Sequence, residues 1–274
     1  MIIEKRIKKK IELGWHYMLD LVWMIEQVKN LPKGATILDA GAGGGLLQFI
    51  LVDLGFNVIS VDFAPRPSPL DIPSIKIMHQ AEFNHAYIDH LKSNYQNARQ
   101  EKSRPIIIRS QKKFVGLLSK RIPIILYQAD LKDMSLCPDN FVDAVVSVSA
   151  LEHLGREHTE KAVKECIRVL KPGRAFLATT SAAEKKDWYH HNSMGWCYTE
   201  SSLRKIFQLP PSVSSNFNSY RQIFAELRKP GNKLHVELAQ FYFDSPHNGM
   251  PWGVWNPSYI PVAIRKFKTS LSNI

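Results

Sequence analysis

The stretch Ala35-Thr-Ile-Leu-Asp-Ala-Gly-Ala-Gly-Gly-Gly-Leu-Leu-Gln48 decides the fold, because it joins an apolar strand to a helix through a turn with glycines at 41, 43 and 45. Residues without side chains let a ligand approach the backbone and the amides at the start of the helix. The sequence therefore predicts a strand over 36–40, a helix over 44–54 and a nucleoside pocket at the turn between them.

The spacing of the glycines narrows the class of ligand. A dinucleotide-binding turn would place its third glycine at position 46, where this chain has Leu. The chain also lacks the GxxxxGK[ST] loop that holds a nucleoside triphosphate. Pyrophosphate binding is thus disfavoured, and what remains is Asp39-x-Gly41-x-Gly43-x-Gly45.

A second apolar run, Asn57-Val-Ile-Ser-Val-Asp62, follows the Gly55 that we expect to end the first helix. Strand, helix and strand together form one βαβ unit. In such a unit the acidic residue at the end of the second strand lies within reach of a ribose diol. Asp62 is therefore the candidate ribose acceptor.

Strands and helices alternate again after residue 121. Such alternation is typical of a doubly wound α/β fold, with a mostly parallel sheet covered by helices on both faces. Beyond residue 181 the pattern is less regular. The expected elements are strands over 122–128, 143–149 and 175–180, a helix over 157–170, a turn at 171–174, a capped helix over 199–209, a candidate strand over 217–224 and a final strand over 260–268.

The expected organisation is one domain with two additions. A helix over 3–30, within an N-terminal segment 1–34, is expected to cover the ligand pocket, and residues 35–274 form the main domain. The segment 63–121 is too long for an ordinary connection and reads as an insertion with a helix near 78–102 and a basic amphipathic stretch near 109–120. It is either a lid or substrate-binding cap, or a structural elaboration.

Composition limits the class of protein. The chain has 274 residues, of which 45% are apolar and 22% charged, as in soluble globular proteins. The basic start is not followed by an apolar signal region, and no run of 18 apolar residues occurs, so we expect a cytoplasmic protein. Three cysteines without CxxC spacing predict neither a disulfide framework nor a zinc site, and no metal is expected.

The formal net charge of +11 comes from 36 basic and 25 acidic residues. A basic face attracts polyanions, so an RNA, an anionic lipid surface or a substrate with phosphate or carboxylate would fit. The alternative is a solvated basic surface, because the cations lack the dense aromatic interleaving of a single-strand binding groove. The expected partner is a small-molecule acceptor that can be anionic, with no membrane span.

Five motifs in this order resemble those of the class I S-adenosylmethionine (SAM) dependent methyltransferases. The resemblance covers residues 35 to about 181 apart from the insertion, and it implies a seven-stranded Rossmann-like sheet. Leu151-Glu-His153 is similar to the branch that acts mainly on small molecules, lipids and sugars. The motifs are Ile37–Gly45, Val58–Asp62, Ala129–Leu131, Asp143–His153 and Leu170–Gly173.

The resemblance implies SAM as cofactor and a role for each matching position. The turn at Gly41, Gly43 and Gly45 would pass beneath the methionine part, with Asp39 orienting the turn or receiving the amino group through water. Asp62 would accept both ribose hydroxyls. Asp130 and the amide of Leu131 would meet the adenine, and the carbonyl near Ser147 would receive the methionine ammonium. Alternatively, Asp39 and Asp62 are loop caps and Asp130 is a turn residue.

Two positions depart from the family pattern. Asn140-Phe-Val-Asp143 stands where Ser-Phe-Asp is usual, which leaves the entry of that strand uncertain by one residue. Arg174 replaces a frequent glycine after Lys171-Pro-Gly173, at a surface turn that should not touch SAM.

Three residues are candidates to accept the proton that an oxygen acceptor loses during methyl transfer, or to orient its hydroxyl. His153 follows the fourth strand, where a parallel sheet opens onto its ligand crevice, and is a candidate general base. Tyr189 and His190, in Asp187-Trp-Tyr-His-His191, follow the fifth strand and could orient or deprotonate a hydroxyl. Each could instead serve packing. The two tryptophans of the loop 247–256 could form a substrate wall or a buried brace.

Three functions remain open on the sequence. The first is an O-methyltransferase acting on a sugar, lipid precursor or natural product. The second is an RNA or other nucleic-acid methyltransferase, although Ser147-Val-Ser-Ala-Leu-Glu152 stands where base-amino enzymes carry an Asn/Asp-Pro-Pro-aromatic motif. The third is a SAM-binding module without catalysis. The acceptor and the oligomeric state are not predicted.

Overall fold

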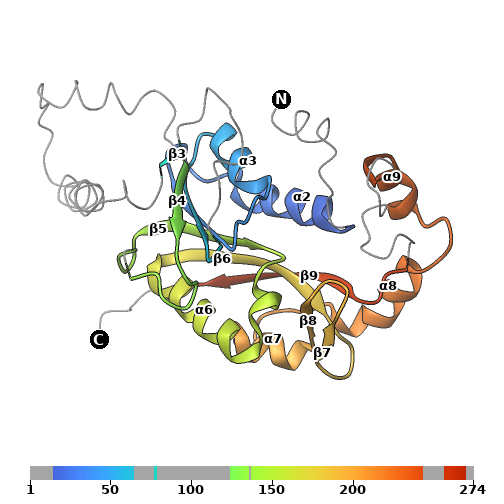
Figure 1. Cartoon of the computed structure of the whole chain (residues 1–274). Coiled ribbons are helices and arrows are strands. Elements are labelled where there is room, and N and C mark those ends of the chain that lie inside the picture. The colour runs from blue at the N-terminus through green and yellow to red at the C-terminus, as the bar shows by residue number, and fades with distance from the viewer. Residues whose placement is uncertain (1–14, 65–76, 79–123, 136, 243–255, 270–274) are drawn as a thin grey trace, which may run out of the picture. The chain divides into compact units, whose positions relative to one another are not determined.

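The computed structural model describes residues 15–64, 77–78, 124–135, 137–242 and 256–269, which form an α/β fold (Figure 1). They divide into two compact units. The first unit draws on segments 1–30, 146–164 and 176–266, and the second on 31–145, 165–175 and 267–274. None of the helices built from these described residues has both the length and the apolar character needed to cross a membrane.

Six α-helices and nine strands lie in the described part of the chain. The α-helices are α2 (Tyr17–Val28), α3 (Leu47–Asp53), α6 (Arg156–Val169), α7 (Glu200–Ile206), α8 (Tyr220–Leu227) and α9 (Lys233–Tyr242), and two short 3₁₀ helices are η4 (Leu151–Leu154) and η5 (Phe217–Ser219). The strands are β1 (Thr36–Ala40), β2 (Asn57–Asp62), β3 (Ile77–Met78), β4 (Ile124–Gln128), β5 (Val142–Val148), β6 (Leu170–Ala182), β7 (Trp188–His190), β8 (Gly195–Tyr198) and β9 (Ile260–Phe267).

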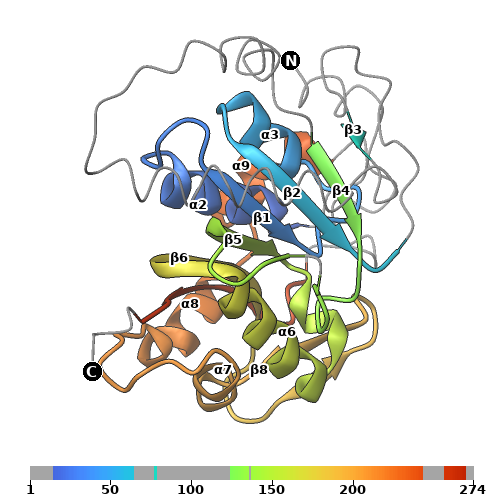
Figure 2. The ribbon, with the colours of Figure 1, turned by 90° about the vertical axis from the view of Figure 1, so that its left-hand side faces the viewer.

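The second unit contains strands in the order β3-β4-β2-β1 and the first part of β5 beside β1, and the pairs β3/β4, β4/β2 and β2/β1 are parallel. Thr36 of β1 is opposite Asn57 of β2, and Ile59 of β2 is opposite Ile125 of β4. Figure 2 shows β2 between β1 and β4. The four central residues of β2 are all buried, as are four of the five in β1, which is expected for strands of a parallel sheet covered on both faces.

The first unit contains β8 between β6 and β7. Strand β8 is parallel to β6, with Ser181 opposite Cys197, and antiparallel to β7, with Trp188 also opposite Cys197. Strand β9 pairs with β6. A buried cluster of Trp15, Ala183, Cys197 and Tyr259 packs beside this hairpin.

The expected fold class is confirmed, and most of the predicted elements lie within two residues of their predicted bounds. The strands near 36–40, 57–62, 122–128, 143–149 and 260–268 are present, as are the helix near 157–170 and the capped helix after Thr199. The helix expected over 44–54 is shorter, because the Gly45 amide donates to the Ala42 carbonyl at 2.9 Å and closes a turn before α3 begins.

Two predictions are wrong. Residues 171–174 are not a turn between helix and strand but part of β6, because the Gly173 amide donates to the carbonyl of Lys268, and the Lys268 amide donates to the carbonyl of Arg174, both at 2.9 Å. Residues 217–224 are not a strand but η5 and the first half of α8. Their aromatic residues recur every three or four positions, which is the period of a helix rather than of a strand.

Some predictions fall outside the described residues. These are residues 3–14 of the N-terminal helix, the helix expected near 78–102 beyond Met78, the amphipathic stretch near 109–120 and the two tryptophans of the loop 247–256. The elements not predicted are the β7–β8 hairpin, α9, the short strand β3 and the 3₁₀ helix η4.

Candidate functional site

The glycine turn after β1 adopts backbone conformations that favour glycine. Gly41 has φ of +74° and Gly43 has φ of +48°, both in the left-handed region. The amides of Gly41 and Ala42 both donate to the Val61 carbonyl, at 2.9 and 3.0 Å, which fixes the turn to the end of β2. The predicted turn is therefore formed by the residues that the sequence singled out.

Asp62 and Gly43 are brought together at this turn. The Gly43 amide donates to Oδ2 of Asp62 at 2.7 Å, and the Ala64 amide donates to Oδ1 at 2.9 Å. The carboxylate is half-buried at the end of β2. A carboxylate oxygen can accept two hydrogen bonds, so both oxygens retain acceptor capacity for the hydroxyls of a diol.

Gln48, at the start of α3, stabilises the glycine turn through hydrogen bonds. Its amide nitrogen donates to the carbonyls of Gly45 and Gly43 at 3.0 and 3.3 Å, and its oxygen accepts from the Ser60 hydroxyl at 2.8 Å. Its side chain is fully buried. The sequence analysis did not single out Gln48, although a glutamine within the otherwise apolar run Leu46-Leu-Gln-Phe49 is the signal that could have revealed it.

The other predicted cofactor residues lie at strand ends or within strands. Asp39 is buried in β1 beside Ser60 of β2. Asp130 follows β4, where its Oδ1 accepts from the Lys132 amide at 2.9 Å and its Oδ2 lies 3.2 Å from Lys132 Nζ. Leu131 is buried next to it. Ser147 is fully buried in the part of β5 that belongs to the first unit.

These residues fit the nucleoside part of SAM by their chemistry. Asp62 offers carboxylate oxygens to vicinal hydroxyls, and the turn presents backbone where a side chain would be strained at positions 41 and 43. A Cβ at Gly43 would also point toward Asp62 Oδ2, 3.8 Å away. The glycine therefore keeps the space beside the carboxylate clear.

His153 lies in η4 with an exposed side chain. Its Nδ1 is 2.9 Å from the Met194 carbonyl, which can only accept, so Nδ1 carries the proton and Nε2 is the basic atom of the neutral ring. The hairpin approaches closely here, because a Cβ at Gly195 would lie 3.1 Å from Glu152 Cγ and 3.4 Å from His153 Cε1. The ring is thus held by η4 and the β7–β8 hairpin.

His190 and Tyr189 are adjacent in β7 but differ in exposure. His190 is buried, its Nδ1 accepts from the Ser193 amide at 3.2 Å, and its Nε2 lies 3.0 Å from the Ser258 hydroxyl. Burial lowers the pKa of His190, with the charge of His191 acting in the same direction. Tyr189 is 36% exposed, and its ring packs on His191 and Trp196. Within this pair, only Tyr189 has a largely accessible ring.

A buried polar network in the first unit was not predicted. His16 Nδ1 donates to Asp20 Oδ2 at 2.7 Å, the Ser149 hydroxyl donates to the same oxygen at 3.0 Å, and His16 Nε2 lies 3.2 Å from the Tyr259 hydroxyl. Ser149, directly after β5, has φ of +44°, a strained conformation for a residue with a side chain. The spacing of His16 and Asp20 by one helical turn was visible in the sequence, but their distant partners were not.

Opposing effects act on the pKa of His16. Burial lowers it, but the charge of Asp20 and the hydrogen bond to it outweigh burial, so the pKa of His16 is raised. Glu152 is buried nearby, its Oε2 has no hydrogen-bond partner among the described residues, and burial raises its pKa despite the charges of His153 and His16. The first unit therefore holds a protonatable imidazole and a carboxyl that resists ionisation.

Within the described residues, no group of three or more His, Cys, Asp or Glu side chains is arranged to hold a metal ion. The buried thiols of Cys137, Cys166 and Cys197 are all free.

Comparison with known proteins adds a family match. A family model described as "Methyltransferase domain" matches residues 76–178. The matched segment contains Asp130, Leu131, Ser147 and His153, whereas the glycine turn and Asp62 precede it. A curated relative, the tRNA (carboxymethyluridine(34)-5-O)-methyltransferase of Arabidopsis thaliana, is 44% identical over 50 residues. That stretch covers 18% of this chain and 12% of the relative.

Solved structures with a similar arrangement include two bacterial proteins. The YcgJ protein of Bacillus subtilis is 15% identical, with a TM-score of 0.47, over 92% of this chain and 99% of its own. The 1,6-didemethyltoxoflavin-N1-methyltransferase of Burkholderia thailandensis, solved with 1,6-didemethyltoxoflavin and S-adenosylhomocysteine, is 14% identical, with a TM-score of 0.40, over 70% of this chain and 71% of its own. The family model thus matches residues 76–178, less than half of the chain, and the described strands form the mostly parallel α/β sheet that the motifs predicted.

Proposed function

We propose that this protein is a SAM-dependent methyltransferase that moves a methyl group to an oxygen of a small-molecule acceptor such as a sugar, a lipid precursor or a natural product. The observation that carries the proposal is the contact between the Gly43 amide and Asp62 Oδ2 at 2.7 Å. It joins the glycine turn to the carboxylate at the end of β2, and this pair has the chemistry to hold a nucleoside by its ribose.

Each of the proposed cofactor-binding residues contacts or positions a different part of SAM. Asp62 accepts hydrogen bonds from the ribose hydroxyls, Asp130 and the Leu131 amide recognise the adenine, and the backbone near Ser147 receives the methionine ammonium. Asp39 orients the glycine turn from within β1. When bound, SAM supplies a methyl group already activated on a sulfonium, so the chain needs only to align the acceptor and manage one proton.

For that proton the geometry favours His153 among the three candidates. Its side chain is exposed, and its Nδ1 is committed to the Met194 carbonyl, which leaves Nε2 to accept a proton. Tyr189 is accessible enough to orient an acceptor hydroxyl. His190 is less suited, because both of its ring nitrogens contact serine residues within the protein.

Calorimetric titration with SAM and S-adenosylhomocysteine tests the cofactor site. Asp62→Ala should weaken binding at least tenfold, because it removes the ribose acceptor. Asp53→Ala is the matched control, since it removes an exposed carboxylate at the end of α3 and should bind like the unaltered protein. Equal affinity of a folded Asp62→Ala protein for SAM would refute the assignment.

An RNA acceptor is the second candidate, favoured by the short match to a tRNA methyltransferase and by the net charge of +11. The two candidates differ in where label from methyl-labelled SAM appears. Incorporation into a small-molecule extract but not into transfer RNA supports the first proposal, and the reverse supports RNA modification. SAM binding without transfer to either would identify a module that binds SAM without catalysis.

A further inference from the structure

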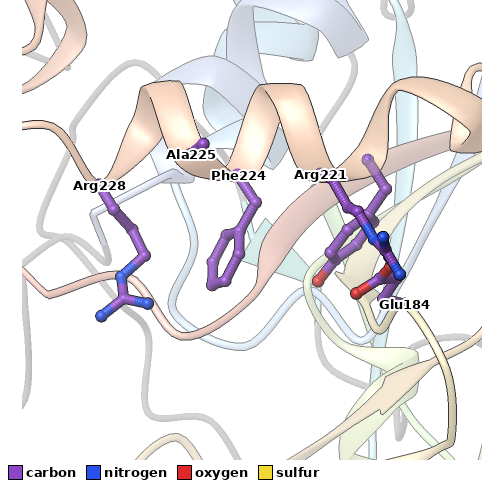
Figure 3. Close-up of a pocket in the computed structure, with 6 residues that line it drawn as sticks. Glu184, Arg221, Phe224, Ala225 and Arg228 are labelled. Carbon is purple, nitrogen blue, oxygen red and sulfur yellow. The ribbon is translucent and has the colours of Figure 1, made fainter.

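A cavity of about 380 Å³ lies on α8 in the first unit (Figure 3). Its helical side is formed by Arg221, Phe224, Ala225 and Arg228, which recur at three- and four-residue spacing and so share one face of α8. Glu184, which follows β6, closes the other side. Neither the proposed cofactor site nor the candidate catalytic residues include any residue of this cavity.

The two arginines of the cavity are in different electrostatic situations. Arg221 forms an ion pair with Glu184, and in Figure 3 their side chains point toward one another. Arg228 is exposed, and none of the described carboxylates is paired with it. The cavity therefore carries one guanidinium whose charge is not balanced by a neighbouring carboxylate, which suits an anion.

The same cavity offers aromatic surface. The Arg228 guanidinium carbon lies 5.5 Å from the centre of the half-buried Phe224 ring, within the range of a cation–π contact. Tyr220 lies 5.8 Å from Phe224, and Phe217 stacks on Tyr220 at 6.1 Å. The hydroxyl of Tyr220 donates to the Ala182 carbonyl at 3.2 Å, which anchors this aromatic row to the end of β6.

We propose that this cavity binds a planar aromatic group that carries a phosphate, such as a nucleotide. The aromatic ring stacks on Phe224 and the guanidinium plane of Arg228, and the phosphate receives hydrogen bonds from that guanidinium. A base stacks favourably on an aromatic side chain, and a guanidinium matches two phosphate oxygens in a fork. The volume is at the lower end of the range for ligand pockets, about 300 to 1,000 Å³, which suits one nucleotide rather than a longer ligand.

Calorimetry on the full chain with adenosine 5′-monophosphate as probe tests the proposal. Titrations contain excess S-adenosylhomocysteine, so that the probe does not report on the nucleoside site proposed at Asp62. Arg228→Gln should weaken binding of the probe at least tenfold, and Phe224→Leu at least fivefold. Lys229→Gln is the matched control, because it removes a neighbouring exposed cation that pairs with Glu226, and it should change affinity less than twofold.

Inorganic phosphate and adenosine test the phosphate-binding and the stacking parts of the proposal separately. Inorganic phosphate and adenosine should each bind at least tenfold more weakly than the monophosphate. Equal affinity for phosphate alone would overturn the aromatic half of the proposal, and unchanged affinity in a folded Arg228→Gln protein would overturn the site. A ten-nucleotide oligoadenylate distinguishes an RNA strand from a free nucleotide. If it binds more tightly than the monophosphate and loses affinity equally in Arg228→Gln, the cavity binds a nucleotide within an RNA strand. If the two probes bind with equal affinity, the cavity binds a free nucleotide.

This test is independent of the cofactor assignment. Asp62→Ala should leave binding of the monophosphate unchanged. If SAM fails to bind while the monophosphate binding depends on Arg228, the cavity proposal holds and the cofactor proposal fails.

Discussion

In the buried pair of His16 and Asp20, the charge of Asp20 favours the protonated form of His16. Asp20 accepts from both His16 and Ser149, and its charge raises the pKa of His16 above the value that burial alone would give. An imidazolium held in this way contributes stability that is fully present below the unfolded pKa of about 6.5. That contribution is lost as the pH rises through the raised folded pKa.

Asp20→Asn should therefore destabilise the protein in a pH-dependent manner. In the variant nothing from Asp20 outweighs burial, so the pKa of His16 falls and the stabilisation of the charged pair is lost below pH 6.5; breaking a buried pair costs about 3 to 5 kcal/mol. Above the raised pKa of His16 the imidazole is neutral in both proteins, so the difference should be smaller. Urea unfolding at pH 6 and pH 9 measures both values. Glu26→Gln, an exposed change on the same helix, should show no such trend, and a pH-independent loss in Asp20→Asn would contradict the charged pair.

His153→Ala tests the proton acceptor proposed for the transfer. Removal of a general base lowers turnover by about 10² to 10⁴-fold, whereas SAM affinity should stay unchanged because the imidazole is not among the proposed cofactor contacts. His158→Ala, an exposed histidine of α6, is the control. The measurement is labelled methyl transfer to the acceptor identified from the extract, beside calorimetry with SAM. Normal turnover in a folded His153→Ala protein would leave this histidine a packing role.

At the scale of elements, Asp187 joins the loop between β6 and β7 to the start of α7. Its carboxylate accepts from the amide and hydroxyl of Thr199 at 2.8 and 2.9 Å, and from the Ser202 hydroxyl at 2.6 Å. Burial raises the pKa of Asp187, but these hydrogen bonds and the charge of Arg156 outweigh burial and lower it. This residue was expected near the acceptor as part of Asp187–His191, and the geometry instead gives it a role in fixing the helix.

Asp187→Ala should cost about 1.5 to 3 kcal/mol at pH 7, the range for hydrogen bonds to a charged group. Because the folded pKa is lowered, the stabilisation is present above the unfolded pKa of about 3.9 and is lost as the pH falls through the folded value. Chemical denaturation at pH 7 and at pH 3 should thus show a large difference that narrows at low pH. Lys186→Ala changes the preceding exposed residue and should be neutral at both values. An equal loss at pH 3 would show that the carboxylate charge is not what stabilises α7.

The elements that could be predicted are those whose determinants are local. Strand β1 is a short apolar run between Gly34 and Gly41, and β2 is a similar run after Gly55. Thr199 begins a helix with a standard cap that accepts from the Ser202 amide. Residues 171–174 look like a turn because Pro and Gly favour turns, but pairing with Lys268, nearly a hundred residues away, makes them part of a strand. Residues 217–224 form η5 and the start of α8 in place of the expected strand, in agreement with the helical spacing of their aromatic residues.

In the candidate site, too, the contacts that could be predicted are those set by local sequence. The contact between Gly43 and Asp62 lies within one βαβ unit, so a motif of local spacing reaches it. Because His16 and Tyr259 are 243 residues apart, no local sequence pattern predicts their contact. The serine partners of His190 explain why a histidine that looked catalytic in the sequence is buried in a structural role that only tertiary contacts determine.

At the scale of the whole molecule, the net charge of +11 predicts attraction to any polyanion, whether or not RNA is the acceptor. Attraction of this kind comes from release of counterions and falls by orders of magnitude between about 50 and 200 mM salt. We therefore expect binding of poly(U), followed by fluorescence anisotropy, to be lost over this range. SAM affinity should change less than threefold, because SAM is not a polyanion and its binding releases no condensed counterions. Neutral dextran in place of poly(U) is the control and should not bind at either salt concentration. Poly(U) binding that persists at 200 mM would show a dedicated RNA surface and favour the nucleic-acid acceptor over the small molecule.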